Sequence, residues 1–228
     1  MPMDTDLRPS LGRTLSRRAF VAGAGALLAA CSRTGYVPEA AYAVDPMLYA
    51  ALPDERFQVP AVKSTDIKPQ FARELVAYDG PEPAGTIIVD PATKYLHFVL
   101  EGGQAMRYGI GVGREGFGWS GRADIARKAA WPRWTPPAEM IARQPELEQY
   151  RHGMDPGLGN PLGARALYLY QDGRDTLYRI HGTNEPRSIG SNVSSGCIRL
   201  INQDVIDLYA RVPVGTRVVV LEAAAPVA

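Results

Sequence analysis

Two residues in the C-terminal part of this chain have the chemistry of a covalent catalyst. His181 and Cys197 stand at the two ends of the stretch HGTNEPRSIGSNVSSGC. A thiol attacks carbonyl groups as its thiolate, and a neighbouring imidazole favours that form by accepting the proton. The alternation in TLYRIHG predicts that His181 ends a strand, and the loop that follows is long enough to bring the sulfur back to the ring. The pattern therefore predicts a Cys–His acyl-transfer site.

The residue before the cysteine supports the same chemistry. Gly196 has no β-carbon, so a substrate carbonyl can approach the backbone N–H groups of Gly196 and Cys197. Two such donors would form an oxyanion hole, which is often the largest single contribution to catalysis. The alternative interpretation is an inert buried cysteine that packs as a small apolar residue.

The first thirty residues resemble an export signal rather than part of a fold. Arg17 and Arg18 precede an apolar run from Ala19 to Ala30 that is too short to span a bilayer. The order Ser-Arg-Arg-x-Phe is similar to a twin-arginine signal. A short buried helix is the alternative, but a run so rich in glycine and alanine would fill a core poorly.

Two cleavage sites are possible after this run. The stretch LAAC, which ends at Cys31, resembles a bacterial lipobox, and cleavage there would leave a lipidated cysteine at the new N-terminus. A rival site follows Ala43 in AYA. We expect lipidation of Cys31 and a domain held at a membrane only by that anchor; Ser32 behind it favours the outer membrane.

The cysteine count also favours chemistry at Cys197. The chain has two cysteines, and Cys31 is used by the lipid or lost by cleavage. In exported proteins most cysteines are paired in disulfides, so one unpaired thiol in an oxidising compartment indicates a reactive role.

The rest of the chain predicts a mainly β domain, a sandwich or barrel of mixed strands with one or two short helices. Residues 32–83 form a tether and lead-in segment, with little periodicity from Ser32 to about Lys68, and residues 223–228 form a tail. Residues 114–165 are irregular and proline-rich and are predicted to form the walls and lid of a cleft, with one short helix at PAEMIAR. The predicted strands are residues 86–90, residues 95–100, a stretch from Gln104, ALYLY, TLYRIHG and TRVVVL.

A second helix is predicted after the cysteine. Asn202 or Asp204 would cap it, and one face would carry apolar side chains. These side chains are Val205, Leu208, Tyr209 and Val212.

Charge and histidine content exclude several other classes. The net charge is +1, which gives no reason to expect a nucleic-acid partner. The three histidines, at 97, 152 and 181, have no spacing that suits a zinc site. We expect His97 to be an ordinary strand residue and His152 to lie in a surface loop.

The motifs HGTN from His181 and SSGCIRL from Ser194 resemble the L,D-transpeptidases with a YkuD-type catalytic domain. NPLGARALYL and WPRWTPP are similar to the branch of this family found in Gram-negative periplasms, and the resemblance covers about residues 84–222. It implies a YkuD-type fold, Cys197 as nucleophile and His181 as general base and then acid. It also implies oxyanion or substrate-binding roles for Gly182, Ser195, Gly196 and Arg199. Many members have histidine where this chain has Ser195.

The resemblance implies a reaction on peptidoglycan that needs no metal or other cofactor. The thiolate would attack the carbonyl of the third residue, a diamino acid, in a tetrapeptide stem and release D-alanine. A second stem, a lipoprotein lysine or water would then accept the acyl group, which gives cross-linking, lipoprotein attachment or trimming. Two further readings stay open: a catalytically silent wall-binding module and a general cysteine peptidase, although the surroundings of the cysteine do not match papain-like or caspase-like enzymes.

Overall fold

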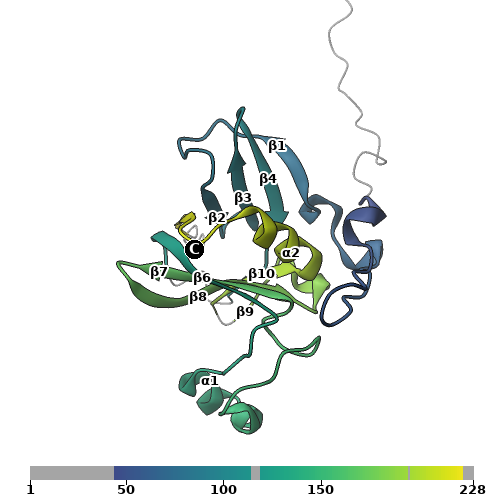
Figure 1. Cartoon of the computed structure of the whole chain (residues 1–228), viewed down its shortest axis with the longest axis vertical. Coiled ribbons are helices and arrows are strands. Elements are labelled where there is room, and N and C mark those ends of the chain that lie inside the picture. The colour runs from purple at the N-terminus through teal and green to yellow at the C-terminus, as the bar shows by residue number, and fades with distance from the viewer. Residues whose placement is uncertain (1–43, 114–118, 195, 223–228) are drawn as a thin grey trace, which may run out of the picture. The chain divides into compact units, whose positions relative to one another are not determined.

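The computed structural model describes residues 44–113, 119–194 and 196–222 (Figure 1). The strands are β1 Glu74–Ala77, β2 Ile87–Asp90, β3 Tyr95–Leu100, β4 Gln104–Gly109, β5 Val112–Gly113, β6 Gly121–Ala130, β7 Arg165–Gln171, β8 Arg174–Thr183, β9 Asn192–Ser194, β10 Ile198–Ile201 and β11 Arg217–Val220. The α-helices are α1 Ala138–Arg143 and α2 Asn202–Arg211. Short 3-10 helices are η2 Pro46–Tyr49, η3 Ser64–Asp66, η4 Pro69–Phe71, η5 Pro145–Tyr150 and η6 Pro186–Ser188.

Nine of the described strands form one mixed sheet that is folded into two layers. Their order is β1-β4-β3-β2-β11-β6-β7-β8-β10, and β5 pairs with β9 in a small separate sheet. The pairs β2–β11 and β8–β10 are parallel, and the other pairs in the large sheet are antiparallel. Figure 1 shows β1 to β4 in one layer, β6 to β8 in the other, and α1 projecting beyond the second layer. The mainly β fold class with two short helices is therefore confirmed.

The main core lies between the layers and is built by alternation along the strands. Ile87 and Val89 of β2 and Leu167 and Leu169 of β7 are buried in one cluster, which also contains Ile180 of β8. Each fully buried side chain of this size contributes about 1.5–3 kcal/mol to the free energy of folding.

Side chains alternate between the two faces of a strand. Because Ile180 faces the core, its neighbours Arg179 and His181 point to the outer face of the second layer.

Helix α2 closes the core with the apolar face predicted for it, but its N-terminus differs from the prediction. Val205, Leu208 and Val212 are fully buried in the main cluster, and Tyr209 packs against it. Ile201 is the N-cap residue, and no side chain caps the helix. Asn202 and Asp204 lie inside the first turn and bond to other segments instead, so the predicted cap is wrong.

The region expected to be irregular, residues 114–165, contains a central strand. β6 pairs with β11 on one side and with β7 on the other. Its sequence GRADIARKAA has one β-branched residue and several charges, which is why the pattern did not indicate a strand. Ala123 and Ile125 are its core-facing residues. The remainder does form an excursion, with α1 at the predicted PAEMIAR stretch.

The lead-in segment differs from the expected tether in its described part, residues 44–83. It contains three 3-10 helices and β1, which pairs with β4. Tyr49, Ile67 and Phe71 are buried in a second cluster with Ile189 and Ile201. These anchors are widely spaced along the chain, so the segment shows no helical or strand period.

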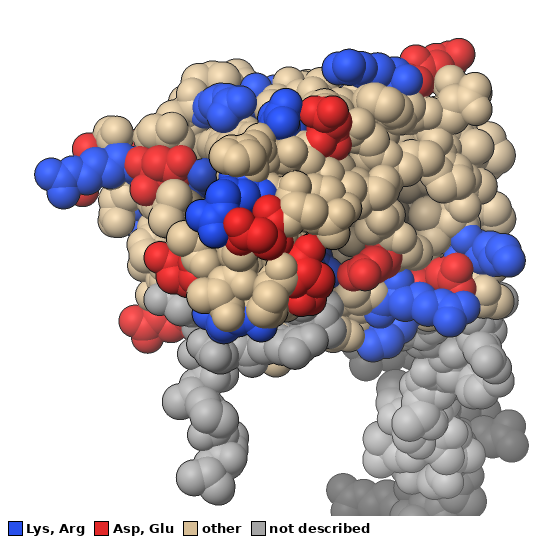
Figure 2. Space-filling model, turned by 90° about the horizontal axis from the view of Figure 1, so that it is seen from below, with Lys and Arg blue, Asp and Glu red and all other residues tan. Residues whose placement is uncertain are grey.

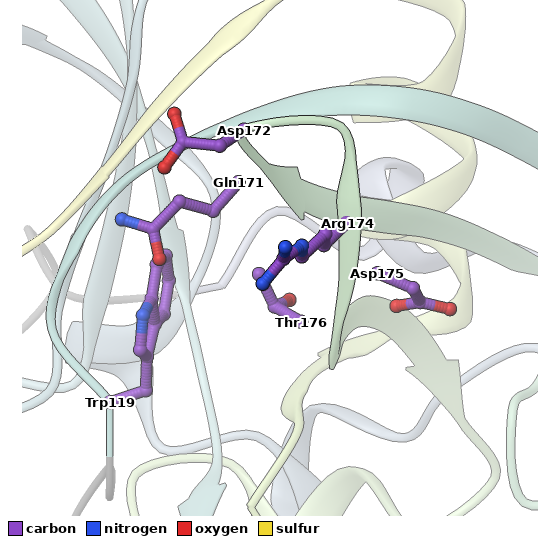
Figure 3. Close-up of a pocket in the computed structure, with 6 residues that line it drawn as sticks. All are labelled: Trp119, Gln171, Asp172, Arg174, Asp175 and Thr176. Carbon is purple, nitrogen blue, oxygen red and sulfur yellow. The ribbon is translucent and has the colours of Figure 1, made fainter.

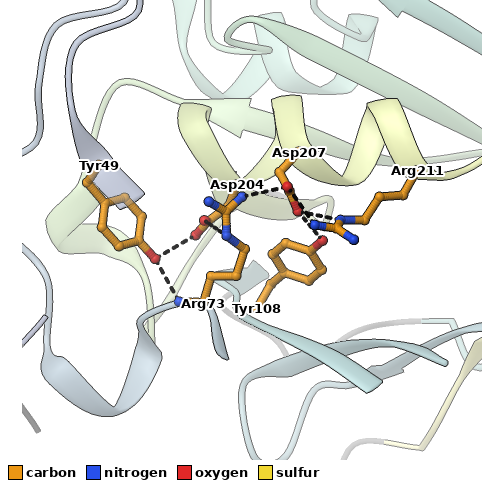
Figure 4. A network of polar contacts seen from close by, with 6 residues as sticks. All are labelled: Tyr49, Arg73, Tyr108, Asp204, Asp207 and Arg211. Atoms are coloured by element: carbon orange, nitrogen blue, oxygen red, sulfur yellow. Dashed lines mark hydrogen bonds and ion pairs between the residues drawn. The ribbon is translucent and has the colours of Figure 1, made fainter. Parts of the chain in front are cut away.

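A polar network fastens this segment to α2 (Figure 4). The Tyr49 hydroxyl donates to Asp204 Oδ2 at 3.1 Å and accepts from the backbone N–H of Arg73 at 2.8 Å. The Arg73 guanidinium lies 3.1 Å from Asp207 Oδ1, and the Tyr108 hydroxyl donates to Asp207 Oδ2 at 2.6 Å. The lead-in segment is therefore part of the folded domain.

Within the described residues, no helix combines the length and the apolar character that crossing a membrane requires.

Candidate active site

The parallel pairing of β8 and β10 brings the predicted catalytic residues together. Arg199 is the register partner of His181, and Ile198 is the partner of Ile180. One more step of this register places Cys197 beside Arg179. With a rise of about 3.3 Å per residue and strands about 4.8 Å apart, the Cα atoms of His181 and Cys197 are roughly 8 Å apart. Both residues are on the outer face of the second layer, because Ile180 and Ile198 face the core.

The His181 ring is held in one tautomer. Its Nδ1 lies 2.7 Å from the Gly182 carbonyl oxygen, which can only accept, so Nδ1 carries the proton. Nε2 is then the atom that can accept a proton. His181 is 4% exposed, and burial, together with the charges of Arg199 and Arg179, lowers its pKa to about 4. The ring is therefore a neutral base at neutral pH.

Cys197 is partly exposed and precedes the first residue of β10. Its Sγ lies 3.9 Å from the Leu177 carbonyl oxygen, within range of a weak S–H···O bond. Burial raises the pKa of the thiol, while a backbone hydrogen bond with Arg179 and the charges of Arg179 and Arg199 oppose that rise. At neutral pH the site therefore holds a thiol and a neutral imidazole.

A bulge in β8 shapes the wall next to the sulfur. Tyr168 of β7 pairs with Arg179 and Tyr170 pairs with Asp175, so three residues of β8 oppose one residue of β7. The middle one, Leu177, has a φ of 64°, a strained value for leucine, and its N–H donates to Asp175 Oδ1 at 2.8 Å. The bulge turns the Leu177 carbonyl toward Cys197. Bulges next to active sites commonly re-aim groups in this way.

Of the two residues before the cysteine, Gly196 has a backbone conformation that favours glycine, whereas Ser195 lies outside the described residues. Gly196 has a φ of 127°, and a β-carbon there would lie 3.5 Å from the Tyr178 ring. The Tyr178 ring stacks on Trp119 with the ring centroids 5.7 Å apart.

Arg199 and Gly182 are held by other parts of the protein. Arg199 pairs with Glu185 at 3.0 Å, and its backbone exchanges two hydrogen bonds with Gly111. The Gly182 N–H donates to the Leu162 carbonyl at 3.1 Å, which leaves its carbonyl to hold the His181 ring. Gly182 therefore orients the imidazole, and its N–H is not available to a substrate oxyanion.

Two residues that support the site, Asn202 and Arg179, were not predicted from the sequence to do so. A β-carbon on Gly182 would lie 2.3 Å from Asn202 Oδ1, which itself accepts from the Ala164 N–H at 2.9 Å. Asn202 therefore ties the start of α2 to Ala164, the residue before β7, and lies close against Gly182 of β8. Arg179 is the second residue, and the alternation of TLYRIHG places it on the same face as His181.

A pocket of about 540 Å³ adjoins the bulge at the β7–β8 turn (Figure 3). Figure 3 shows Trp119 and Gln171 along one wall and Arg174 with Thr176 facing them, while Asp175 points away. Trp119, which lines this pocket, stacks on Tyr178, two residues before Ile180 in β8. The pocket offers an open, mostly polar surface next to the site.

Charges around the domain are mixed. Figure 2 shows basic and acidic side chains interspersed over the face seen from below, the side of Figure 1 on which α1 projects. Among the described residues, no group of three or more His, Cys, Asp or Glu side chains is placed to hold a metal ion.

Comparison with protein-family models identifies the family of this chain. The family model for the L,D-transpeptidase catalytic domain, YkuD, matches residues 84–220, and the chain therefore belongs to that family. The matched region contains both His181 and Cys197.

Individual relatives carry the same family name. The chain is 39% identical over 144 residues to "Probable L,D-transpeptidase YbiS" of Escherichia coli K12, covering 58% of this chain and 43% of that protein. It is 37% identical over 142 residues to "Probable L,D-transpeptidase ErfK/SrfK" of Salmonella typhimurium, covering 60% and 44%. These matches span less than half of each relative.

A solved structure from Brucella melitensis is 51% identical and covers 68% of this chain and 96% of its own, with a TM-score of 0.48. It is described as a probable carnitine operon oxidoreductase, which is a statement about the Brucella protein.

Proposed function

We propose that this chain is an exported L,D-transpeptidase that acts on the stem peptides of peptidoglycan, with Cys197 as nucleophile and His181 as general base and acid. The observation that carries the proposal is the parallel register of β8 and β10, which makes the two residues neighbours on one face. Membership of the YkuD family supports the reaction class.

The first step is acylation of the sulfur. Nε2 of His181 takes the thiol proton as Sγ attacks the carbonyl of the third stem residue, so a C–S bond forms and the carbonyl becomes a tetrahedral oxyanion. The backbone N–H groups of Gly196 and Cys197 are the proposed donors to that oxyanion. The C–N bond then breaks, and the imidazolium gives its proton to the departing amine of D-alanine. Burial lowers the pKa of His181, which favours return of the proton from the imidazolium to the departing amine.

The second step transfers the acyl group from sulfur to an acceptor. An amine attacks the thioester and passes a proton to His181, and the sulfur leaves and recovers that proton as a thiol. A diamino acid of another stem would give a cross-link, a lipoprotein lysine would give wall attachment, and water would give carboxypeptidase activity. The ion pair of Arg199 with Glu185 supports a role for Arg199 in ordering the site.

We also propose where the protein is located in the cell. Residues 1–31 are proposed to be a twin-arginine-type signal that ends in a lipobox, with Cys31 lipidated and the domain periplasmic. Cys31 lies outside the described residues. Mass analysis of the mature protein, purified from both the membrane and the soluble fractions of cells, would give a diacylated N-terminal Cys31 if this is correct and an N-terminus after Ala43 if the rival cleavage site is used.

Covalent trapping of the cysteine tests the function directly. Incubation of the protein with a carbapenem, followed by intact mass measurement, should add one drug-sized adduct. Cys197→Ala should abolish it, and Cys31→Ser, at the other cysteine of the chain, should retain it. Absence of an adduct on the wild-type protein would contradict the proposal and favour a non-catalytic wall-binding module.

The natural reaction needs a second test. The protein is incubated with disaccharide-tetrapeptide, and the products are separated by mass. Release of D-alanine together with a tripeptide or a stem dimer is expected, and His181→Gln should suppress both. An unchanged tetrapeptide would refute the assignment of the substrate. The ratio of dimer to tripeptide would distinguish cross-linking from trimming.

A further inference from the structure

A row of side chains crosses four elements and ends at the cysteine. Arg127 of β6 is the register partner of Tyr168 of β7, Tyr168 is the partner of Arg179 of β8, and one step beyond the β8–β10 pairing puts Cys197 beside Arg179. Both guanidinium carbons lie over the Tyr168 ring, at 4.3 Å for Arg127 and 4.6 Å for Arg179. Such contacts contribute about 0.5–1 kcal/mol at exposed sites.

The Arg179 side chain is held in a defined position. Its two terminal nitrogens donate to the two Asp175 oxygens at 2.7 and 2.8 Å, and the side chain is 15% exposed. Asp175 is placed for this pairing by the β8 bulge, where it also accepts from the Leu177 N–H. A bidentate pair and a ring contact together fix the charge in space.

Several charged and titratable groups surround the sulfur. From β8 these are Arg179 with its partner Asp175 and Tyr178, and from β10 Arg199. Arg179 acts on the sulfur twice, through a backbone hydrogen bond and through its guanidinium charge, both of which favour the thiolate, whereas the Asp175 charge opposes it.

We propose that Arg179 is a positioning residue that stabilises the anionic sulfur of Cys197, and that Asp175 fixes the guanidinium and limits how much of its charge the sulfur feels. The inference rests on the proposed function for its catalytic meaning. Its physical content, the reactivity of the thiol, can be measured without turnover.

Alkylation of the single remaining thiol is the experiment. In full-length protein carrying Cys31→Ser, Cys197 is the only cysteine, so its rate of reaction with iodoacetamide against pH gives the thiol pKa. Arg179→Gln should raise that pKa and Asp175→Asn should lower it. A unit charge at about 8 Å in an effective dielectric of about 20 corresponds to up to roughly thirtyfold in thiolate population.

The opposite signs separate this proposal from a merely structural role. Both substitutions break the same ion pair, so a pair that only holds the bulge together would shift the alkylation rate in the same direction in both variants. Shifts in the same direction, or no shift in Arg179→Gln, would overturn the proposal. Arg179→Lys keeps the charge without the bidentate pair and should stay within about threefold of wild type. This variant also decides the matter if Arg179→Gln does not fold.

Arg127→Gln is the matched control. It removes the same type of charge from the other side of the Tyr168 ring, two strands further from the sulfur than Arg179. Arg127 is exposed, so distance and salt screening should hold its effect on the alkylation rate to a small fraction of that of Arg179→Gln. If the wild-type protein fails to release D-alanine but the alkylation series shows the opposite shifts, the proposed function fails and the electrostatic role of Arg179 stands.

Discussion

The buried carboxyl group of Asp204 should make the domain lose stability as pH rises. Asp204 is fully buried and receives one hydrogen bond, from the Tyr49 hydroxyl, while Arg73 Nε lies 3.8 Å from its Oδ1. Oδ1 has no hydrogen-bond partner among the described residues. Burial outweighs the Arg73 charge and the Tyr49 hydrogen bond, and it raises the pKa of Asp204 from an ordinary 3.8 to about 7.

The sign follows from proton binding in the two states. Between about pH 4 and pH 7 the folded domain keeps a proton on Asp204 that the unfolded chain has released, so folding is favoured at low pH and this stability is lost as pH rises through 7. The shift corresponds to about 4 kcal/mol over the window. His181 acts in the opposite direction: its pKa, lowered from an ordinary 6.5 to about 4, gives about 3 kcal/mol that is lost as pH falls from 6.5 to 4.

The two contributions oppose each other, so the wild-type domain should change little in stability between about pH 4.5 and 6.5. It should then lose less than about 1 kcal/mol up to about pH 7.5 and stay level above that. Asp204→Asn has no proton to release, and it should instead gain stability from about pH 4.5 to 6.5 and remain level above that. Urea unfolding at a series of pH values, read as the free energy of unfolding, measures both curves.

Asp207→Asn is the control for this comparison. Asp207 lies one turn further along α2 and is partly buried, yet hydrogen bonds from Arg211 and Tyr108 and the charge of Arg73 lower its pKa. This variant should keep the loss of stability above pH 6.5. If Asp204→Asn follows the wild-type curve between about pH 4.5 and 7, the carboxyl is already ionised in the folded domain over that range and the reasoning is refuted.

Two further substitutions test the supports of the site. Gly182→Ala should reduce stability by about 1–3 kcal/mol and slow acylation of the cysteine, because the new β-carbon would meet Asn202 Oδ1 at 2.3 Å; a urea midpoint equal to wild type would show that α2 can shift without cost. Glu55→Gln should cost about 1–2 kcal/mol, because the carboxylate receives hydrogen bonds from both Arg165 and Trp131 Nε1; an unchanged midpoint would mean that this part of the lead-in segment adds nothing to stability.

The sequence was most informative where strands carry β-branched and aromatic residues. IIVD, YLHFVL and RALYLYQ are strands β2, β3 and β7 at close to the predicted positions. β6 was missed because alanine, arginine and lysine make up most of it, and its strand conformation comes from pairing on both sides with β11 and β7. Tertiary pairing overrides weak intrinsic preference in central strands.

The lead-in segment was misjudged for a related reason. Its buried residues come singly, at Tyr49, Ile67 and Phe71, each in or next to a short 3-10 helix. Such spacing has no period of 2 or 3.6, which is the signal that sequence analysis depends on. The polar anchors Tyr49 and Arg73 act through partners more than 100 residues away.

The site was predictable in its side chains and unpredictable in its backbone. A histidine at the end of a strand and a cysteine after glycine identify the reacting pair by type. The Gly182 carbonyl holds the His181 ring, and the Leu177 carbonyl lies near the sulfur. Because every residue has a backbone carbonyl, the amino-acid sequence does not reveal either contact. Leu177 is itself an unusual choice for a positive φ, so the bulge could not be inferred from composition.

Backbone pairing on both sides of β10 explains how such a site keeps its geometry. β10 is the last strand of the nine-stranded sheet, and an unpaired edge would leave the chain after Cys197 free to move. Gly111 removes that freedom by exchanging two hydrogen bonds with Arg199, at 2.9 and 3.0 Å, on the side opposite β8. A β-carbon at Gly111 would meet the Ser188 carbonyl at 3.0 Å, so glycine permits the close approach. Strand β10 is thus paired with β8 on one side, and Arg199, two residues after the sulfur, is bonded to Gly111 on the other. Main-chain contacts on both sides therefore fix the backbone that carries Cys197 relative to the backbone that carries His181.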